Sequence, residues 1–169
     1  YKRSEHVVAL SPGMQDGVVK AGTPVSKTSM IPNMSKPDIF HPHEVNEAIV
    51  KRFDLNLSKF NVIHFGMLAV ANGLEYIVNA AIELKKRGDD SINFIFMGEG
   101  AMEPELKEIV KREGLTNVQF LGNHPVGVVA EVTNCCGASI TSFKNLPILA
   151  TNSPNKLFDS LSAGKPIIV

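Results

Sequence analysis

The sequence predicts an α/β fold in which a parallel β-sheet is flanked by helices. From residue 61 onward, short runs of apolar and β-branched residues alternate with stretches whose apolar residues recur every three or four positions. This alternation is typical of consecutive β-α-β units, because two neighbouring parallel strands need a crossover connection that a helix can supply. With 169 residues, of which 44% are hydrophobic and 20% charged, the chain can bury one sizeable core.

The first two units follow this pattern closely. We expect a strand over residues 61–65 and then a helix that ends at Gly88, with an apolar face formed by Leu74, Ile77, Val78, Ala81 and Ile82. A second strand is expected over residues 92–97, followed by a helix that ends at Gly114 and turns inward Leu106, Ile109 and Val110.

The next two strands are shorter. Residues 118–122 predict a third strand, residues 126–133 a helix, and residues 138–141 a fourth strand. Residues 142–152 have no periodic pattern, and we expect a polar loop there.

The last helix has favourable residues at its start. Ser153 is expected to cap it, and Pro154 stands where a missing N–H costs nothing. Its sheet-facing residues would be Leu157, Phe158 and Leu161. Residues 166–169 begin a fifth strand.

The first 60 residues behave differently. Residues 6–10 predict a short strand and residues 13–20 a helix, whereas residues 30–42 form a proline-rich crossing of the kind found between domains. The chain starts without Met and stops after Pro166-Ile167-Ile168-Val169, so we expect it to be a fragment of a longer protein.

Charge and cysteine content narrow the classes of function. Lys plus Arg number 17, as do Asp plus Glu, so no large basic field is available to bind nucleic acid or an anionic membrane surface. The only cysteines, Cys135 and Cys136, are adjacent, which suits neither a disulfide framework nor a zinc site. We therefore expect buried structural thiols and a cytoplasmic setting. No apolar run approaches the roughly 20 residues that span a bilayer.

Ligands of open parallel sheets bind beyond the carboxyl ends of the strands. Gly66, Gly98 and Gly100 follow two of the expected strands and would let backbone approach a ligand closely. The helix that starts near Pro154 offers free N–H groups to a phosphate, and Lys156 adds a positive charge there. Packing glycines and ordinary helix capping are the alternative explanations. Gly98 and Gly100 lack the third glycine of a dinucleotide-binding motif.

The ionisable residues leave two questions open. Asp159 could accept hydrogen bonds from ribose hydroxyls or simply face solvent. The five histidines have no Ser, Cys or carboxylate at a spacing that suggests a catalytic triad or a metal site. We interpret them as surface or hydrogen-bonded structural residues.

The run from Ser153 to Val169, SPNKLFDSLSAGKPIIV, resembles the donor-site signature of family-4 (group 1) glycosyltransferases. It is similar in particular to the branch that transfers amino sugars in bacterial polysaccharide assembly. Three further segments resemble the family in order and spacing: the crossing from Met30 to Pro42, the strand and turn over residues 94–100, and the strand over residues 118–122.

The resemblance implies a Rossmann-like domain that is the C-terminal half of a GT-B fold, truncated near its end. Residues 1–33 would then be the tail of the N-terminal acceptor domain and the crossing, and residues 34–169 the incomplete nucleotide-sugar-binding domain. By the family pattern, Asp159 would hold the ribose, and the backbone at Leu121 and Gly122 would read the base. The nucleotide pocket would be lined by Gly66, Gly98 and Gly100, and the diphosphate would be faced by Asn155, Lys156 and Leu157.

Two departures from the family stand out. The first acid of the family's Glu-x7-Glu motif falls at Thr151, and the basic pair of the loop after the first strand is replaced by Met67 and Asn72. Neutralisation of the diphosphate must therefore come from Lys156, from the helix dipole, or from residues outside this chain.

The resemblance implies a retaining glycosyltransferase that moves a sugar from a nucleotide-diphosphate donor, with UDP the expected nucleotide, to an acceptor hydroxyl of a surface polysaccharide or glycolipid. It implies no cofactor and no obligatory metal. The glycan or lipid-linked acceptor would bind through the missing domain, with the full-length protein cytoplasmic or at the inner face of the membrane. The fragment alone would be inactive, and no catalytic residue can be named. A non-catalytic nucleotide-sugar-binding module and a GT-B-fold sugar-nucleotide epimerase are the alternatives.

Overall fold

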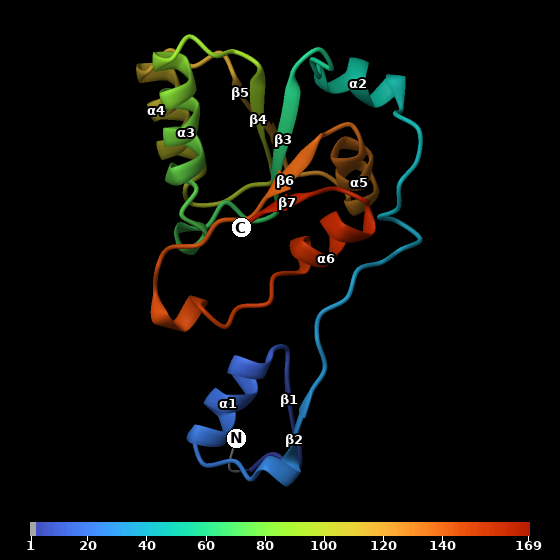
Figure 1. Cartoon of the computed structure of the whole chain (residues 1–169), viewed down its shortest axis with the longest axis vertical. Helices are drawn as coiled ribbons and strands as arrows, with labels where there is room; N and C mark the ends of the chain where they lie inside the picture. The colour runs from blue at the N-terminus through green and yellow to red at the C-terminus, as the bar shows by residue number, and fades with distance from the viewer. Residues whose placement is uncertain (1–2) are drawn as a thin grey trace.

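The computed structural model describes residues 3–169 and confirms the α/β fold. It has two parts, a small N-terminal one and a larger one built on a five-stranded sheet (Figure 1). The small part consists of strand β1 (Val7–Ala9), helix α1 (Pro12–Lys20), the short 3-10 helix η1 (Val25–Lys27) and strand β2 (Thr28–Met30), with β1 and β2 paired in parallel. The two strands form a sheet of their own, and the division into domains at residue 33 stays a prediction.

All five strands of the larger sheet run in parallel, in the order β5-β4-β3-β6-β7. The strands are β3 (Phe60–Phe65), β4 (Ile92–Met97), β5 (Val118–Gly122), β6 (Ala138–Ile140) and β7 (Ile167–Ile168). Each was expected from its apolar run. Because every strand points the same way, the loops that follow them meet at one edge of the sheet.

Helices cover both faces of this sheet (Figure 1). Successive residues of β4 serve opposite faces, with Phe94 and Phe96 in one core and Ile95 and Met97 in the other. The first core packs against α3 (Glu75–Lys86) and α4 (Glu103–Arg112). The second involves α2 (Glu47–Phe53), α5 (Val126–Asn134) and the residue after α6 (Asn155–Ser162).

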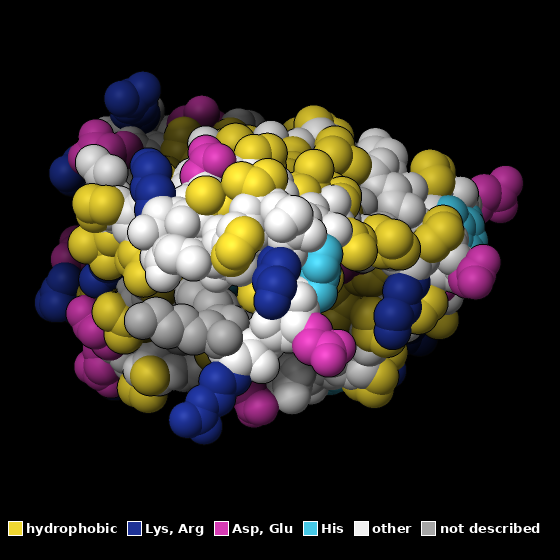
Figure 2. All heavy atoms as spheres, turned by 90° about the horizontal axis from the view of Figure 1, so that it is seen from below, with side chains coloured by type: hydrophobic (Ala, Val, Ile, Leu, Met, Phe, Trp, Pro, Cys, Tyr) yellow, Lys and Arg dark blue, Asp and Glu magenta, His cyan; other side chains and the backbone are white. Residues whose placement is uncertain are grey.

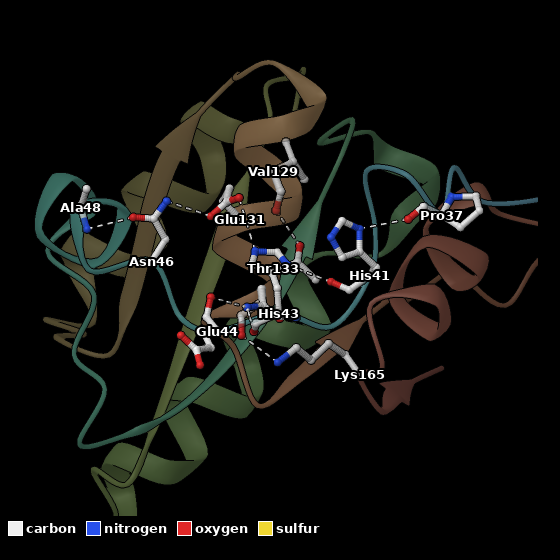
Figure 3. Close-up of polar contacts among 11 residues, drawn as sticks. Pro37, His41, His43, Glu44, Asn46, Ala48, Val129, Glu131, Thr133 and Lys165 are labelled. Atoms are coloured by element: carbon white, nitrogen blue, oxygen red, sulfur yellow. Dashed lines mark hydrogen bonds and ion pairs between the residues drawn. The ribbon is translucent and has the colours of Figure 1, made fainter.

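The chain between β2 and α2 is tied to α5 by polar contacts (Figure 3). The buried Asn134 amide donates to the carbonyl oxygens of His43 and Glu44, and Lys165 Nζ donates to the Asn134 carbonyl at 2.7 Å. Glu131 accepts a 3.1 Å hydrogen bond from Asn46 and lies 3.3 Å from His43 Nε2. These bonds satisfy backbone groups of a segment that has no regular structure of its own.

The structure corrects three details. Pro154, not Ser153, is the N-cap of α6, and no side chain caps the helix; the Ser153 carbonyl accepts a hydrogen bond from Asn33. Leu161 does not face the sheet: it is 56% exposed, and the buried residue of that turn is Ser160. Helix α2 was not expected, although Asn46 caps it by accepting from the Ala48 N–H.

The surface carries no large field of one sign in the view of Figure 2, where Lys and Arg are scattered among Asp, Glu and apolar side chains. This distribution agrees with the equal numbers of acidic and basic residues, 17 of each. Within residues 3–169, no helix is both long and apolar enough to cross a membrane.

The loops after β3 and β4 touch backbone to backbone. Gly66 N–H donates to the Met97 carbonyl at 2.8 Å, and Leu68 N–H donates to the Glu99 carbonyl at 2.9 Å. A Cβ atom at Gly98 would lie 2.0 Å from the Gly66 oxygen, and Gly98 also has a φ of +150°. This contact requires a residue without a side chain.

We predict that Gly98→Ala lowers the free energy of unfolding by at least about 2 kcal/mol, because the added methyl group must push the two loops apart. Urea unfolding followed by far-UV circular dichroism measures this change. The control is Gly127→Ala in α5, where a Cβ would have nothing within 4 Å. This control should be neutral or gain up to about 1 kcal/mol from helix propensity. Equal stability of the two variants would contradict the prediction.

Candidate functional site

A cavity of about 350 Å³ lies at the carboxyl ends of β3 and β4. It is the location that the parallel topology predicts for a ligand. Its lining comes from the loops after β3, β4 and β5, from α5 and α6, and from the crossing segment: Phe40, Phe65, Gly66, Met67, Met97, Gly98, Glu99, Asn123, His124, Val126, Val129 and Asp159.

One side of the cavity is apolar. The rings of Phe40 and Phe65 are stacked with centroids 6.0 Å apart, and Phe40 comes from the crossing segment rather than from the sheet. Met97, Val126 and Val129 continue this surface. Phe40, Phe65 and Met97 are at most 6% exposed, so this wall offers a ligand apolar packing rather than an open ring face for stacking.

The loop after β5 provides polar groups. Asn123 donates to Glu99 Oε1 at 3.1 Å, which joins the loops after β4 and β5. His124 Nε2 lies 2.8 Å from the Leu121 carbonyl oxygen, and Gly122 adopts a φ of +75° that lets the chain turn here. Leu121 and Gly122 directly precede these two lining residues in the sequence but are not themselves part of the cavity lining.

Asp159 lies on the cavity wall, one helical turn into α6. Its Oδ1 accepts a 2.7 Å hydrogen bond from the hydroxyl of Ser35 in the crossing segment. Desolvation raises the pKa of this carboxyl group, against smaller lowering effects of the Ser35 hydrogen bond and the Lys36 charge. Asp159 therefore lines the cavity, and its role as an acceptor for ribose hydroxyls stays a prediction.

Lys156 extends from the first turn of α6 to a place beneath Gly66. Its Cε and Nζ atoms each lie 3.7 Å from the position that a Cβ of Gly66 would take. Nζ is 3.4 Å from Nε2 of His64, which is 1% exposed. Burial lowers the pKa of Lys156 from 10.5 to about 8. A partly desolvated ammonium group therefore lies directly below the cavity floor.

The structure brings only part of the expected site together. Gly66, Gly98 and Asp159 line the cavity, whereas Lys156 is outside the lining, with Nζ 3.7 Å from the position that a Cβ of Gly66 would take. Gly100 has a packing reason of its own, since a Cβ there would lie 2.5 Å from the Leu68 oxygen. Asn155 and Leu157 share the first turn of α6 with Lys156.

Several lining residues were not expected from the sequence. Phe40 is separated from the β3 loop by more than 20 residues, and the aromatic wall becomes visible only once the crossing segment is placed. Glu99, Asn123 and His124 directly follow β4 and β5. Their position after strands was the signal that could have identified them.

Thr151 and Asn72, two of the residues that differ from the family pattern, make contacts within this chain. Thr151 packs against Gly13 of α1, and its carbonyl accepts a 2.7 Å hydrogen bond from Ser11. Asn72 is buried and donates to the Met67 carbonyl at 2.6 Å, which closes the loop after β3, while Met67 itself is 70% exposed.

The sequence profile of the family described as Glycosyl transferases group 1 matches residues 59–169. The chain belongs to this family. The matched residues include the whole five-stranded sheet and most of the residues that line the cavity. The resemblance of residues 153–169 to this family is confirmed.

Curated relatives of this group 1 glycosyl transferase match it over part of their length. The alpha-galactosylglucosyldiacylglycerol synthase of Streptococcus pneumoniae is 33% identical over 100 residues, which is 58% of this chain and 25% of the synthase. The alpha-D-kanosaminyltransferase of Streptomyces kanamyceticus is 37% identical over 54 residues, or 32% of this chain and 14% of the transferase. The chain thus spans a quarter or less of the length of these two relatives.

Solved structures with this fold are GT-B glycosyltransferases. HepE of Anabaena in complex with UDP-glucose superposes with a TM-score of 0.78 at 21% identity, over 97% of this chain and 44% of HepE. WaaG, a glycosyltransferase involved in lipopolysaccharide biosynthesis, gives a TM-score of 0.77 at 13% identity, over 95% of this chain and 42% of WaaG. The expected C-terminal half of a GT-B fold is confirmed.

The two thiols of this group 1 glycosyl transferase lie in the core, away from the cavity lining. Burial raises the pKa of the Cys135 thiol, and it raises that of Cys136 to about 12. We predict that both thiols react with Ellman's reagent at pH 8 at least about a hundredfold more slowly in the native chain than in 6 M guanidinium chloride. Rapid native labelling of either thiol would contradict their assignment as structural residues.

Proposed function

We propose that this chain is the donor-binding part of a retaining glycosyltransferase. The enzyme transfers a sugar from a nucleotide-diphosphate donor, UDP-linked, to an acceptor hydroxyl in surface polysaccharide or glycolipid biosynthesis. The observation that carries the proposal is the cavity at the carboxyl ends of β3 and β4, which has an apolar aromatic wall, a carboxylate on one side and a buried cation below its floor.

Each part of a nucleoside diphosphate has a matching surface here. The base packs against the Phe40 and Phe65 side of the cavity and meets the loop after β5 with its polar edge. The ribose hydroxyls donate to Asp159, whose two oxygens can accept two neighbouring hydroxyl groups. The diphosphate lies over Gly66, near Lys156 and the N-terminus of α6.

Catalysis follows from the charge that grows on the departing diphosphate. Lys156 and the dipole of α6 stabilise this charge more strongly in the transition state than in the bound donor, which is how binding groups accelerate a reaction. No obligatory metal is required in this proposal. The acceptor binds through the domain that precedes residue 34 in the full-length enzyme, so the chain alone does not transfer sugar.

The UDP-glucose complex of HepE supports the choice of donor class, and the names of two relatives support the acceptor class. One relative is a diacylglycerol glycolipid synthase, and WaaG takes part in lipopolysaccharide biosynthesis. The kanosaminyltransferase supports an amino sugar as the transferred group. We propose that the full-length protein works in the cytoplasm, at the inner face of the membrane.

A non-catalytic nucleotide-sugar-binding module is the second candidate, because Thr151 replaces the first motif acid and contacts α1 instead. The two candidates differ in one measurement. Transfer from a radiolabelled UDP-sugar to a lipid or glycan acceptor by the full-length protein supports the enzyme. Tight donor binding without transfer supports the module.

We predict that Asp159→Asn weakens UDP binding to this chain about tenfold or more. The amide is uncharged and has one acceptor oxygen, whereas the carboxylate is charged and has two. Isothermal titration calorimetry with UDP, GDP and ADP at pH 7 measures the affinity and identifies the preferred base. Asn at this position can still accept from Ser35, so the fold should be preserved.

The matched control is Asp38→Asn, an exposed carboxylate of the same crossing segment that does not line the cavity. It should leave the UDP affinity within about twofold of the unmodified chain. Selective nucleotide binding that is unaffected by Asp159→Asn would place the ribose elsewhere.

A further inference from the structure

His64 is the most deeply buried ionisable residue near the cavity, and nothing in the family pattern assigns it a role. It lies in β3, one residue before Phe65, and is 1% exposed. A buried imidazole is unfavourable unless both ring nitrogens find partners. The partners of this ring are therefore informative.

The two ring nitrogens of His64 have different partners. Nδ1 lies 3.2 Å from the carbonyl oxygen of Ile140 at the end of β6. A carbonyl can only accept, so Nδ1 carries the proton and Nε2 presents a lone pair. Lys156 Nζ lies 3.4 Å from this lone pair, and an ammonium group can only donate. The neutral ring therefore accepts from Lys156.

Further groups surround the ring. The Met67 carbonyl also faces it, β4 contributes Phe96 at 6.1 Å between ring centroids, and α6 contributes Lys156. Burial first, and then the Lys156 charge, lower the pKa of His64 to about 3. The ring is thus neutral at physiological pH, when it can accept a hydrogen bond.

The Lys156 ammonium has no counter-charge of its own. Among residues 3–169, no carboxylate lies within ion-pair distance of Nζ, and burial is the cause that lowers its pKa. An ammonium group without a carboxylate, held below a glycine that lines a cavity, is arranged to meet an anion from the solvent side.

We propose that His64 is a positioning residue of the donor site: its neutral ring holds the Lys156 ammonium beneath Gly66, where the ammonium meets the diphosphate of the bound donor. This inference rests on the proposed function. The β3 loop lacks the basic pair of the family pattern. In this proposal Lys156 of α6 takes its place, because His64 of β3 directs the Lys156 ammonium to the same position.

The arrangement makes donor binding depend on pH. Above about pH 8, Lys156 of the free chain loses its proton, and binding a diphosphate must then be accompanied by proton uptake. The affinity for UDP should therefore fall as pH rises from 7 to 9.5, approaching a tenfold loss for each unit above the midpoint. Uridine has no phosphate but shares the uracil N3–H, which itself ionises towards the top of this range, so UDP should lose more affinity with rising pH than uridine does.

The test compares His64→Phe, His64→Gln and Lys156→Met in the full chain by calorimetry with UDP and with uridine between pH 6.5 and 9.5. Phe fills the apolar site but offers no acceptor, so UDP should bind about tenfold more weakly at pH 7, with its pH midpoint shifted down. Uridine affinity should stay within about twofold.

Gln returns an acceptor oxygen near the Nε2 position and should recover most of the UDP affinity. In Lys156→Met the decrease of UDP affinity with pH should shrink to that of uridine.

Two outcomes overturn the inference in different ways. If the chain binds UDP with the expected pH dependence but His64→Phe changes neither affinity nor midpoint, His64 has no positioning role although the proposed function stands. If the unmodified chain binds no nucleotide, the proposed function itself fails. The Lys156 titration, followed by NMR of its Cε resonance, then still tests the pair, because an equal midpoint in the unmodified chain and in His64→Phe overturns it.

Discussion

The close approach of the loops after β3 and β4 is the constraint on which the rest of the site depends. The two loops share backbone hydrogen bonds, and no side chain fits between Gly66 and Gly98. This contact places the floor of the cavity directly at the ends of two central strands. Gly66 has no side chain, and the end of the Lys156 side chain lies 3.7 Å from the position that a Cβ of Gly66 would take. A bulkier loop would separate the cation from the cavity.

Electrostatic interactions with a ligand act over short distances in this molecule. The chain carries equal numbers of acidic and basic residues, 17 each, so long-range steering of an anionic ligand is weak. A partly desolvated lysine interacts with an anion more strongly than a solvated one, because less water screens the pair. A single buried ammonium group can therefore do what several surface cations do in a basic patch, provided that its position is fixed.

Much of the fold could be predicted from the sequence, since each strand of the large sheet coincides with an apolar run and most of the helices end at a glycine or a basic turn. The errors have physical causes. Ser153 has the residue type of a cap, but α6 begins one residue later, with Pro154 at the N-cap, and the position of a helix start to within one residue is not fixed by propensity. Leu161 has helical spacing, yet the sheet beneath it accommodates the smaller Ser160.

The site was predictable only where it follows from topology. Gly66, Gly98 and Asp159 could be placed because strand ends and a helix start meet at one edge. Phe40 and the pairing of His64 with Lys156 depend on the path of the crossing segment and on the direction of one long side chain. The spacing of residues along the sequence reveals neither feature. One of the histidines interpreted as surface or structural residues, His64, therefore contacts a residue of the candidate site.

The hydrogen bond from Ser35 to Asp159 has a mechanical consequence. Ser35 belongs to the segment that enters the large domain from β2, whereas Asp159 lies on the cavity wall. A ligand hydroxyl at Oδ1 would share this oxygen with Ser35, and a shift of the segment that removes Ser35 leaves both lone pairs of Oδ1 to the ligand. Occupancy of the cavity and the path of the interdomain chain are therefore reciprocally linked, with a free energy set by one carboxylate oxygen.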